Sequence, residues 1–306
     1  MGRVCSDSLN ILLAAYVIHM AISNRLEVHT GLGGLKVKRP CFNNPNVSKG
    51  VYMNVMDLFS GIGGFSLGFE RAGMTTSVFC EIDQRCRDVL SKRWPNAIIL
   101  EDVKSIGDIN VKKIDVICGG FPCQDISNAN SGNMSGLEGS KSGLWSEFYK
   151  QICKNRPSFV VVENTPALRS RGLDRILNEL AQIGYDAEWH CIPATAVDSP
   201  HSRDRVWIIS YPSGLGSRIP AGQVLTRRHF SEYFSRWKAE PDICRVADGV
   251  PSQSHRLRQL GNSIVPQIAE VIGRAIMEAE RNDQEYKEKG GSQELNLTSC
   301  GIIRPL

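Results

Sequence analysis

The chain has 306 residues, of which 42% are hydrophobic and 22% are charged, and its formal net charge is +4 at pH 7. This length suits one large domain, or one domain with a smaller companion, and the composition excludes a disordered or fibrous protein. The 10 cysteines include no C-x-x-C pair and no Cys/His cluster at zinc spacing. We therefore expect no metal site and a reducing compartment, namely the cytoplasm.

Residues 1–52 differ from the rest of the chain. The apolar stretch 11–22 is too short to span a bilayer, and no good small-residue cleavage site follows it, so we expect neither a membrane anchor nor export. A stretch rich in Gly, Pro and Asn comes next. The first clear strand begins beside Met53, and we interpret residues 1–52 as an N-terminal extension that is dispensable or precedes the natural start.

A strand, a glycine turn and a helix open the main part of the chain. The apolar run 51–58 ends in F-S-G-I-G-G-F at 59–65, and a helical pattern closed by Gly73 follows. Such a turn lets a nucleotide-like ligand approach the backbone and the helix N-terminus, although it can also be only a tight turn. The next strand, 77–80, ends at Glu81, where a carboxylate can bind two ribose hydroxyls. Together these features favour a cofactor site.

Two further strands also end in polar residues. Asp102 follows the strand 97–100, and it either accepts a hydrogen bond from an adenine amino group or caps a helix. The run 114–118 leads into G-G-F-P-C-Q-D-I-S at 119–127. Because ligands of doubly wound sheets bind outside the carboxyl ends of the strands, we interpret Cys123 as a reactive thiol rather than a small buried cysteine. We predict that residues 128–143 form a mobile loop that closes over a substrate.

The strand 159–162 runs into Glu163, which is either desolvated for acid–base chemistry or solvated on a loop. A helix at 173–183 and strands at 185–193 and 205–210 follow. Arg203 and Arg205 alternate, so in an extended segment both point to one face, which is often only a solvated edge.

Basic and aromatic residues alternate between residues 211 and 244. This pattern suits contacts with phosphates and bases, although a small amphipathic subdomain would look similar. The residues concerned are Arg218, Arg227, Arg228, His229, Phe230, Tyr233, Phe234, Arg236, Trp237 and Lys238. A last helix is predicted to end at about residue 280, before a polar tail that we expect to be disordered.

Taken in order, these segments resemble the cytosine-5 DNA methyltransferase family over about residues 53–276. The similarity lies in D-L-F-S-G-I-G-G-F, the acidic Glu81, P-C-Q, E-N-T, R-D-R, R-V-A-D-G and G-N-S-I-V-P. The last two motifs are similar to those of phage and prophage members. The resemblance implies an α/β fold, a Rossmann-like doubly wound sheet that binds S-adenosylmethionine, with a small irregular target-recognition domain.

The resemblance also implies the roles of individual residues. Cys123 matches the nucleophile that adds to carbon 6 of a flipped-out cytosine, Glu163 matches the residue that binds the ring nitrogen edge, and Arg205, supported by Arg203, matches the residue near the base carbonyl. Eight residues match the S-adenosylmethionine site: Phe59, Gly61, Ile62, Glu81, Asp102, Leu144, Asn262 and Ser263.

The predicted organisation follows from this match. We expect a catalytic and cofactor-binding domain at 53–210, a short target-recognition region at 211–260, a C-terminal helix at 261–280 that returns to the catalytic domain, and a polar tail at 281–306. Duplex DNA is the expected partner, and the protein is expected to be a monomer with no membrane association. The sequence leaves open whether a cognate restriction endonuclease accompanies it or whether it acts without one.

The sequence departs from the family pattern in three places. Thr165 replaces the usual valine, which we expect to be tolerated, and His201 stands where many members have glutamine, which leaves the support of Arg203 open. The span between Ser210 and Arg245 is short, which weakens the prediction of substrate more than that of reaction. Two alternatives therefore remain: an RNA cytosine-5 methyltransferase on the same scaffold, and a non-catalytic DNA-binding relative. A dinucleotide oxidoreductase would not explain P-C-Q or E-N-T.

Overall fold

The computed structural model describes residues 28–29, 36–37, 51–107, 111, 113–122, 143–219, 223–233, 259 and 261–289. The chain divides into two compact units, residues 1–50 and 51–306. In the first unit, β1 (Val28–His29) pairs antiparallel with β2 (Lys36–Val37). The predicted apolar segment 11–22 lies outside the described residues, as do Cys123, the predicted loop at 128–142 and the R-V-A-D-G motif.

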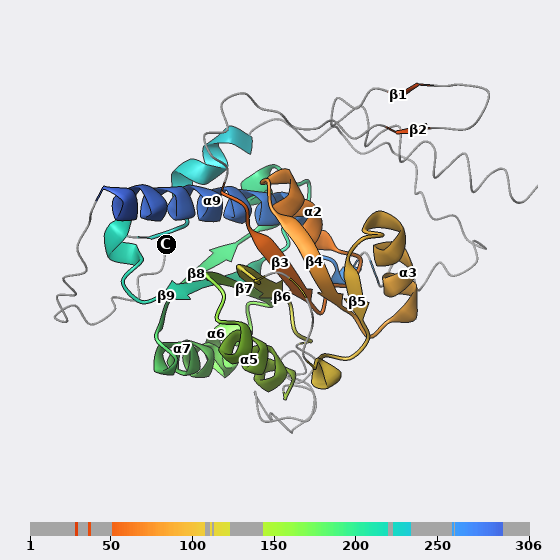
Figure 1. Cartoon of the computed structure of the whole chain (residues 1–306), viewed down its shortest axis with the longest axis horizontal. Coiled ribbons are helices and arrows are strands. Elements are labelled where there is room, and N and C mark those ends of the chain that lie inside the picture. The colour runs from red at the N-terminus through yellow and green to blue at the C-terminus, as the bar shows by residue number, and fades with distance from the viewer. Residues whose placement is uncertain are drawn as a thin grey trace, which may run out of the picture. The chain divides into compact units, whose positions relative to one another are not determined.

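A seven-stranded sheet organises the second unit, in the order β5-β4-β3-β6-β7-β9-β8 (Figure 1). Only β9 runs antiparallel to its neighbours β7 and β8, and the other described pairings are parallel. The strands are β3 (Asn54–Leu58), β4 (Thr75–Cys80), β5 (Ile98–Leu100), β6 (Val116–Gly119), β7 (Phe159–Asn164), β8 (Tyr185–Ile192) and β9 (Arg205–Pro212). This mostly parallel sheet confirms the predicted α/β fold.

Alternate residues of each strand point to opposite faces of the sheet, and both faces are buried. In β7, Phe159 and Val161 join one core cluster, whereas Val160 and Val162 join the other. Continuous apolar runs are the sequence pattern of such strands, which is why they could be located from the sequence.

Helices cover the two faces (Figure 1). On one face α2 (Gly64–Arg71) packs against α9 (Pro266–Glu288), and a Cβ on Gly68 would lie 2.6 Å from the Cβ of Ala269, so the close approach requires glycine. The other face carries α5 (Leu144–Asn155), α6 (Leu168–Arg171) and α7 (Leu173–Gln182). Beside β4 and β5 lies α3 (Gln84–Arg93), with Leu90 and Trp94 packed on Phe79.

The region after β9 differs from the prediction. Strand β9 continues to Pro212, past the expected boundary at 210. The described residues that follow, 213–219 and 223–233, are called here the post-β9 segment. They include the short 3₁₀ helices η4 (Gly216–Arg218) and η5 (Arg227–Tyr233). Leu215, Ile219, Val224 and Leu225 are buried in the same core as α9, so this segment packs on the domain that contains the sheet.

The C-terminal helix is longer than expected. It was predicted to end at about residue 280, but α9 runs to Glu288. The physical reason is Asp283, which is 4% exposed and binds both Arg218 and Lys287 at 2.6 Å. A polar-looking stretch thus contains a buried, paired carboxylate. No helix in the described ranges is long and apolar enough to cross a membrane.

Candidate active site

The carboxyl edge of the sheet brings several of the predicted site residues together. The parallel strands β3, β4, β6 and β7 all end there, and β9 begins there because it runs the other way. In the β7–β9 register Glu163 is opposite Trp207, and Asn164 is opposite Val206. Arg205, the first residue of β9, is therefore delivered to the end of β7.

Glu163 and Arg205 form an ion pair at this edge. Glu163 Oε1 lies 2.8 Å from Arg205 Nε, and Glu163 is 8% exposed. Burial raises the pKa of the Glu163 carboxyl, while the nearby charges of Arg205 and Arg203 oppose that shift. The net result is a carboxyl group that takes up a proton more readily than an ordinary glutamate. The sequence had left open whether Glu163 is desolvated, and the structure shows that it is.

Strand β7, which carries Glu163, also contacts the residues that lead to Cys123. A Cβ on Gly120 would lie 2.6 Å from Glu163 Oε2, so only glycine leaves room for this carboxyl. The side chain of Asn164 donates from Nδ2 to the Phe121 carbonyl at 3.2 Å. Asn164 and Gly120 were not singled out from the sequence, since these contacts join different strands. Cys123, two residues beyond Phe121, lies outside the described residues, and its role stays a prediction.

The glycine turn is shaped by left-handed backbone at Phe59 (φ 57°), Gly61 (φ 54°) and Gly63 (φ 84°). Glu81 fixes this turn: its Oε2 accepts from Gly61 N at 2.7 Å and its Oε1 accepts from Asp83 N at 2.8 Å. Each carboxylate oxygen has a further lone pair for a ligand hydroxyl. No described atom lies within 4 Å of where a Cβ on Gly61 would stand, so the turn is open on that side.

Asp102 acts as a helix cap in this structure. Its side chain accepts from Lys104 N at 2.9 Å and thereby caps η1 (Val103–Ser105), the second of the two roles expected from the sequence. A contact with an adenine amino group remains a prediction. Leu144 begins α5 and is half-buried, while Phe59 stacks on Phe148 of that helix, with ring centroids 6.4 Å apart.

The C-terminal segment returns to the glycine turn, as the resemblance implied. A Cβ on Gly64 would lie 3.0 Å from Ser263 Oγ, and Asn262 beside it is exposed. Arg203 donates from Nη1 to the Gly261 carbonyl at 2.5 Å. The two arginines of R-D-R therefore have different partners: Arg205 binds Glu163, and Arg203 binds the returning chain.

Asp57 lies beneath the glycine turn and was missed. It is fully buried on β3, where it accepts a hydrogen bond from Ser66 Oγ at 2.7 Å and lies against the Cys118 thiol. Burial raises its pKa to about 7, although the Ser66 hydrogen bond opposes the shift. The signal was present, because Asp57 is the one acid in the apolar run 51–58.

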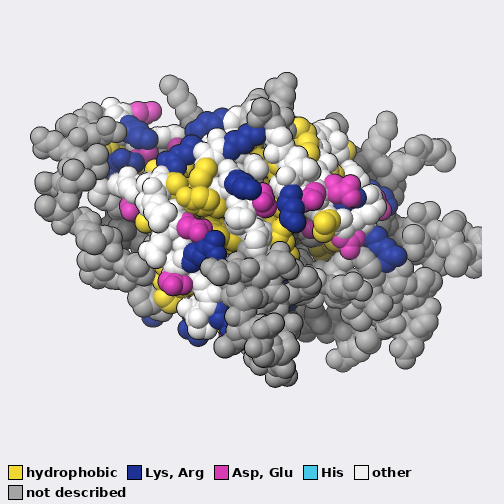
Figure 2. All heavy atoms as spheres, turned by 90° about the horizontal axis from the view of Figure 1, so that it is seen from below, with side chains coloured by type: hydrophobic (Ala, Val, Ile, Leu, Met, Phe, Trp, Pro, Cys, Tyr) yellow, Lys and Arg dark blue, Asp and Glu magenta, His cyan; other side chains and the backbone are white. Residues whose placement is uncertain are grey.

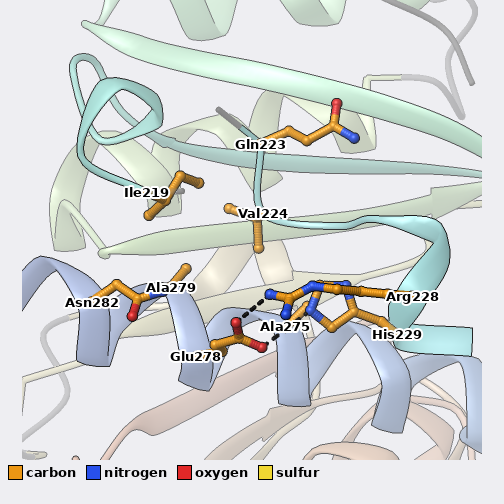
Figure 3. Close-up of a pocket in the computed structure, with 9 residues that line it drawn as sticks. All are labelled: Ile219, Gln223, Val224, Arg228, His229, Ala275, Glu278, Ala279 and Asn282. Carbon is orange, nitrogen blue, oxygen red and sulfur yellow. Dashed lines mark hydrogen bonds and ion pairs between the residues drawn. The ribbon is translucent and has the colours of Figure 1, made fainter. Parts of the chain in front are cut away.

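A small pocket between the post-β9 segment and α9 carries ionic contacts (Figure 3). Arg228 and His229 point toward Glu278 of α9, and His229 Nε2 lies 3.4 Å from Glu278 Oε2. Ile219 and Val224 close the pocket against Ala275 and Ala279. These contacts dock the segment on α9. None of the described residues predicted for the site lines this pocket, and Glu163 and Arg205 lie instead at the carboxyl edge of the sheet.

Known proteins are similar to the part of the chain that contains this site. The family model for C-5 cytosine-specific DNA methylase matches residues 53–241. The type II methyltransferase M2.BsuMI of Bacillus subtilis is 36% identical over 166 residues, which cover 52% of this chain and 42% of that protein. M1.HphI of Haemophilus parahaemolyticus is 31% identical over 173 residues, or 53% of this chain and 46% of its own length.

A candidate DNA modification methyltransferase encoded within an E. coli prophage has a solved structure that is 28% identical, with a TM-score of 0.45 over 53% of this chain and 47% of that one. The matched part thus spans under half the length of the two curated relatives. Because the family model covers more than half of the chain and includes the sheet edge described above, the protein belongs to the C-5 cytosine-specific DNA methylase family.

Proposed function

We propose that the protein is a DNA (cytosine-5)-methyltransferase, which transfers a methyl group from S-adenosylmethionine to carbon 5 of a flipped-out cytosine in duplex DNA. The observation that carries this proposal is the buried Glu163, which is bonded to Arg205 and faces the side-chain-free Gly120 just before the P-C-Q motif. Family membership supports it independently.

The chemistry requires a covalent step, because carbon 5 of cytosine is a poor nucleophile. The Cys123 thiolate adds to carbon 6, and the electrons of the 5,6 double bond make carbon 5 nucleophilic. Once carbon 5 carries the methyl group, it loses its proton. The bond between the Cys123 sulfur and carbon 6 then breaks, and the 5,6 double bond re-forms. The base must leave the duplex for this chemistry, since neither face of its ring is accessible in the stack.

Glu163 supports the addition by binding ring nitrogen 3. Burial raises the pKa of Glu163 and so makes its carboxyl group easier to protonate, which suits the transfer of a hydrogen bond or a proton to that nitrogen as the thiolate adds. Arg205 keeps Glu163 in place and has further N–H groups for the base carbonyl. Arg203 anchors the returning chain at Gly261, so its role is to position rather than to react.

The glycine turn fits an adenosine-type ligand such as S-adenosylmethionine, which supplies a methyl group on a positively charged sulfur. The open side of Gly61 leaves space for the ligand, Glu81 is placed for the ribose hydroxyls, and Ser263 lies beside the start of α2. The remaining predicted contacts come from Phe59, Ile62, Asp102, Leu144 and Asn262.

The test is the transfer of labelled methyl from S-adenosylmethionine to duplex DNA and to RNA side by side, with Cys123→Ala as the control. We expect label on DNA from the wild type and none from the variant, which should still bind S-adenosylmethionine. Label on RNA alone would keep the mechanism and change the substrate. Turnover in the variant would exclude the covalent step, and label on neither polymer would favour a non-catalytic DNA-binding protein.

A further inference from the structure

The arginines after β9, which the sequence pattern suggested for DNA contact, are already neutralised in part. Arg218 binds Asp283, and Arg228 binds Glu278. Both carboxylates belong to α9. A guanidinium held by a carboxylate has less charge to offer a phosphate, and cations without such a partner are better suited to contact DNA.

The turn that follows Glu163 carries two such cations. Helix α6 comes directly after E-N-T-P, at the carboxyl edge of the sheet, and contains Arg169 and Arg171. Neither has a carboxylate partner among the described residues. Arg169 is exposed; Arg171 is half-buried, and its enclosed Nη1 has no hydrogen-bond partner in the described part of the chain. Figure 2 views the molecule from the side of α5, α6 and α7 and shows Lys and Arg side chains interspersed with Asp and Glu side chains on this face.

The turn is also held in place. Leu168 is fully buried in the core on this face, Leu168 N donates to Thr165 O at 3.0 Å, and Arg169 N donates to Pro166 O at 3.2 Å. The backbone that carries the two arginines is therefore held in place after Glu163, and less backbone freedom is lost when they bind a ligand.

We infer that α6 is a phosphate-binding element for duplex DNA, in which Arg169 and Arg171 contact backbone phosphates beside the flipped nucleotide. The inference rests on the proposed function, since it places the target base at Glu163. A base bound there brings its flanking phosphates to the same edge of the sheet, and arginine binds phosphate oxygens through paired N–H groups. Residues two apart on a helical turn point in different directions, so we expect each arginine to contact a different phosphate.

The experiment measures the affinity for a mixed-sequence DNA duplex as a function of salt, by fluorescence anisotropy, for the wild type and R169Q/R171Q. The slope of log K against log salt is negative, and each lost phosphate contact reduces its magnitude by about 0.9. The slope of the double variant should therefore be smaller in magnitude by about 1.8, and that of each single variant by about half as much. The control R281Q/K289Q removes the same charge from two exposed positions, one in α9 and one directly after it, and should keep the wild-type slope.

Three outcomes would overturn the inference: an unchanged slope in R169Q/R171Q, an equal fall in the α9 control, or wild-type binding to RNA but not to DNA. Methyl transfer and S-adenosylmethionine binding are measured on the same preparations. A wild type that methylates DNA while R169Q/R171Q keeps its slope would remove this inference alone. A wild type that neither binds nor methylates duplex DNA would remove the proposed function and the inference with it.

Discussion

The carboxyl edge of the sheet and the face of α9 contain the same kinds of residue and use them in opposite ways. On α9, Glu278 and Asp283 neutralise arginines of the post-β9 segment and dock it on the domain. At the carboxyl edge, Glu163 is buried with a raised pKa, and the α6 arginines lack a carboxylate partner among the described residues. The difference indicates that the number of arginines in a segment is not enough to predict a nucleic-acid surface. The carboxylate partners of each arginine must also be considered, because they reduce the charge that it can offer a phosphate.

The largest expected effect tests the carboxyl edge. Glu163→Gln keeps the shape of the side chain but cannot transfer a proton, so we expect methyl transfer to fall about 10²–10⁴-fold, the range for loss of a general acid. Initial rates of label transfer measure it, together with S-adenosylmethionine affinity, which should not change. Glu147→Gln, which removes the carboxylate paired with Lys150, is the matched control. A Glu163→Gln rate within a few-fold of wild type would assign the proton to another group.

A second test concerns stability beneath the glycine turn. Burial raises the pKa of Asp57 from its ordinary 3.8 to about 7, so between these pH values the folded state binds more protons than the unfolded state. The free energy of unfolding therefore falls as the pH rises through this range, by about 3 kcal/mol between pH 5 and pH 8, at 1.36 kcal/mol for each unit.

Asp57→Asn should remove most of that fall, as measured by urea unfolding at both pH values. Asp88→Asn, at an exposed position of α3, is the control and should keep the wild-type fall. If Asp57→Asn loses as much stability with rising pH as the wild type, the buried acid is not the group responsible.

The smallest effects compare the two contacts of α9. Arg218→Gln leaves the buried Asp283 with Lys287 alone, so we expect a loss of about 2 kcal/mol in the free energy of unfolding. Arg228 is 62% exposed in its pair with Glu278, and Arg228→Gln should cost less than about 1 kcal/mol. Denaturant unfolding measures both. Equal losses of stability would contradict the distinction between a buried and an exposed ion pair. If either variant also lowered the salt dependence of DNA binding, the arginine would contact DNA rather than only dock the segment on α9.

Much of the fold could be predicted because buried parallel strands leave a direct trace in the sequence. The runs at 51–58, 114–118 and 159–162 are apolar and end in glycine or polar residues, so both the strands and the edge that carries the site could be located. The glycine turn and Glu81 were joined by their spacing, and the structure shows the hydrogen bond between them.

The rest depends on contacts that no local pattern records. Asn164 reaches a carbonyl 43 positions earlier in the chain, and Arg203 binds one 58 positions later. The length of α9 depends on Asp283, which looks like surface until its partner Arg218 is placed. The order of the strands decides these contacts, and the insertion of the antiparallel β9 between β7 and β8 could not be inferred from hydrophobic periodicity.

The reversed direction of β9 has a consequence for how such a protein can change. The chain leaves β9 at Pro212, at the opposite edge from Glu163, and is back beside Arg203 at Gly261. Both ends of the intervening stretch are fastened to the domain, through Ser213 N bonded to Gly184 O at one end and Gly261 O bonded to Arg203 at the other. Residues inserted between positions 233 and 261 would therefore leave the pair Glu163–Arg205 in place, whereas changes at residues 213–219 and 223–225 would disturb the core that this segment shares with α9.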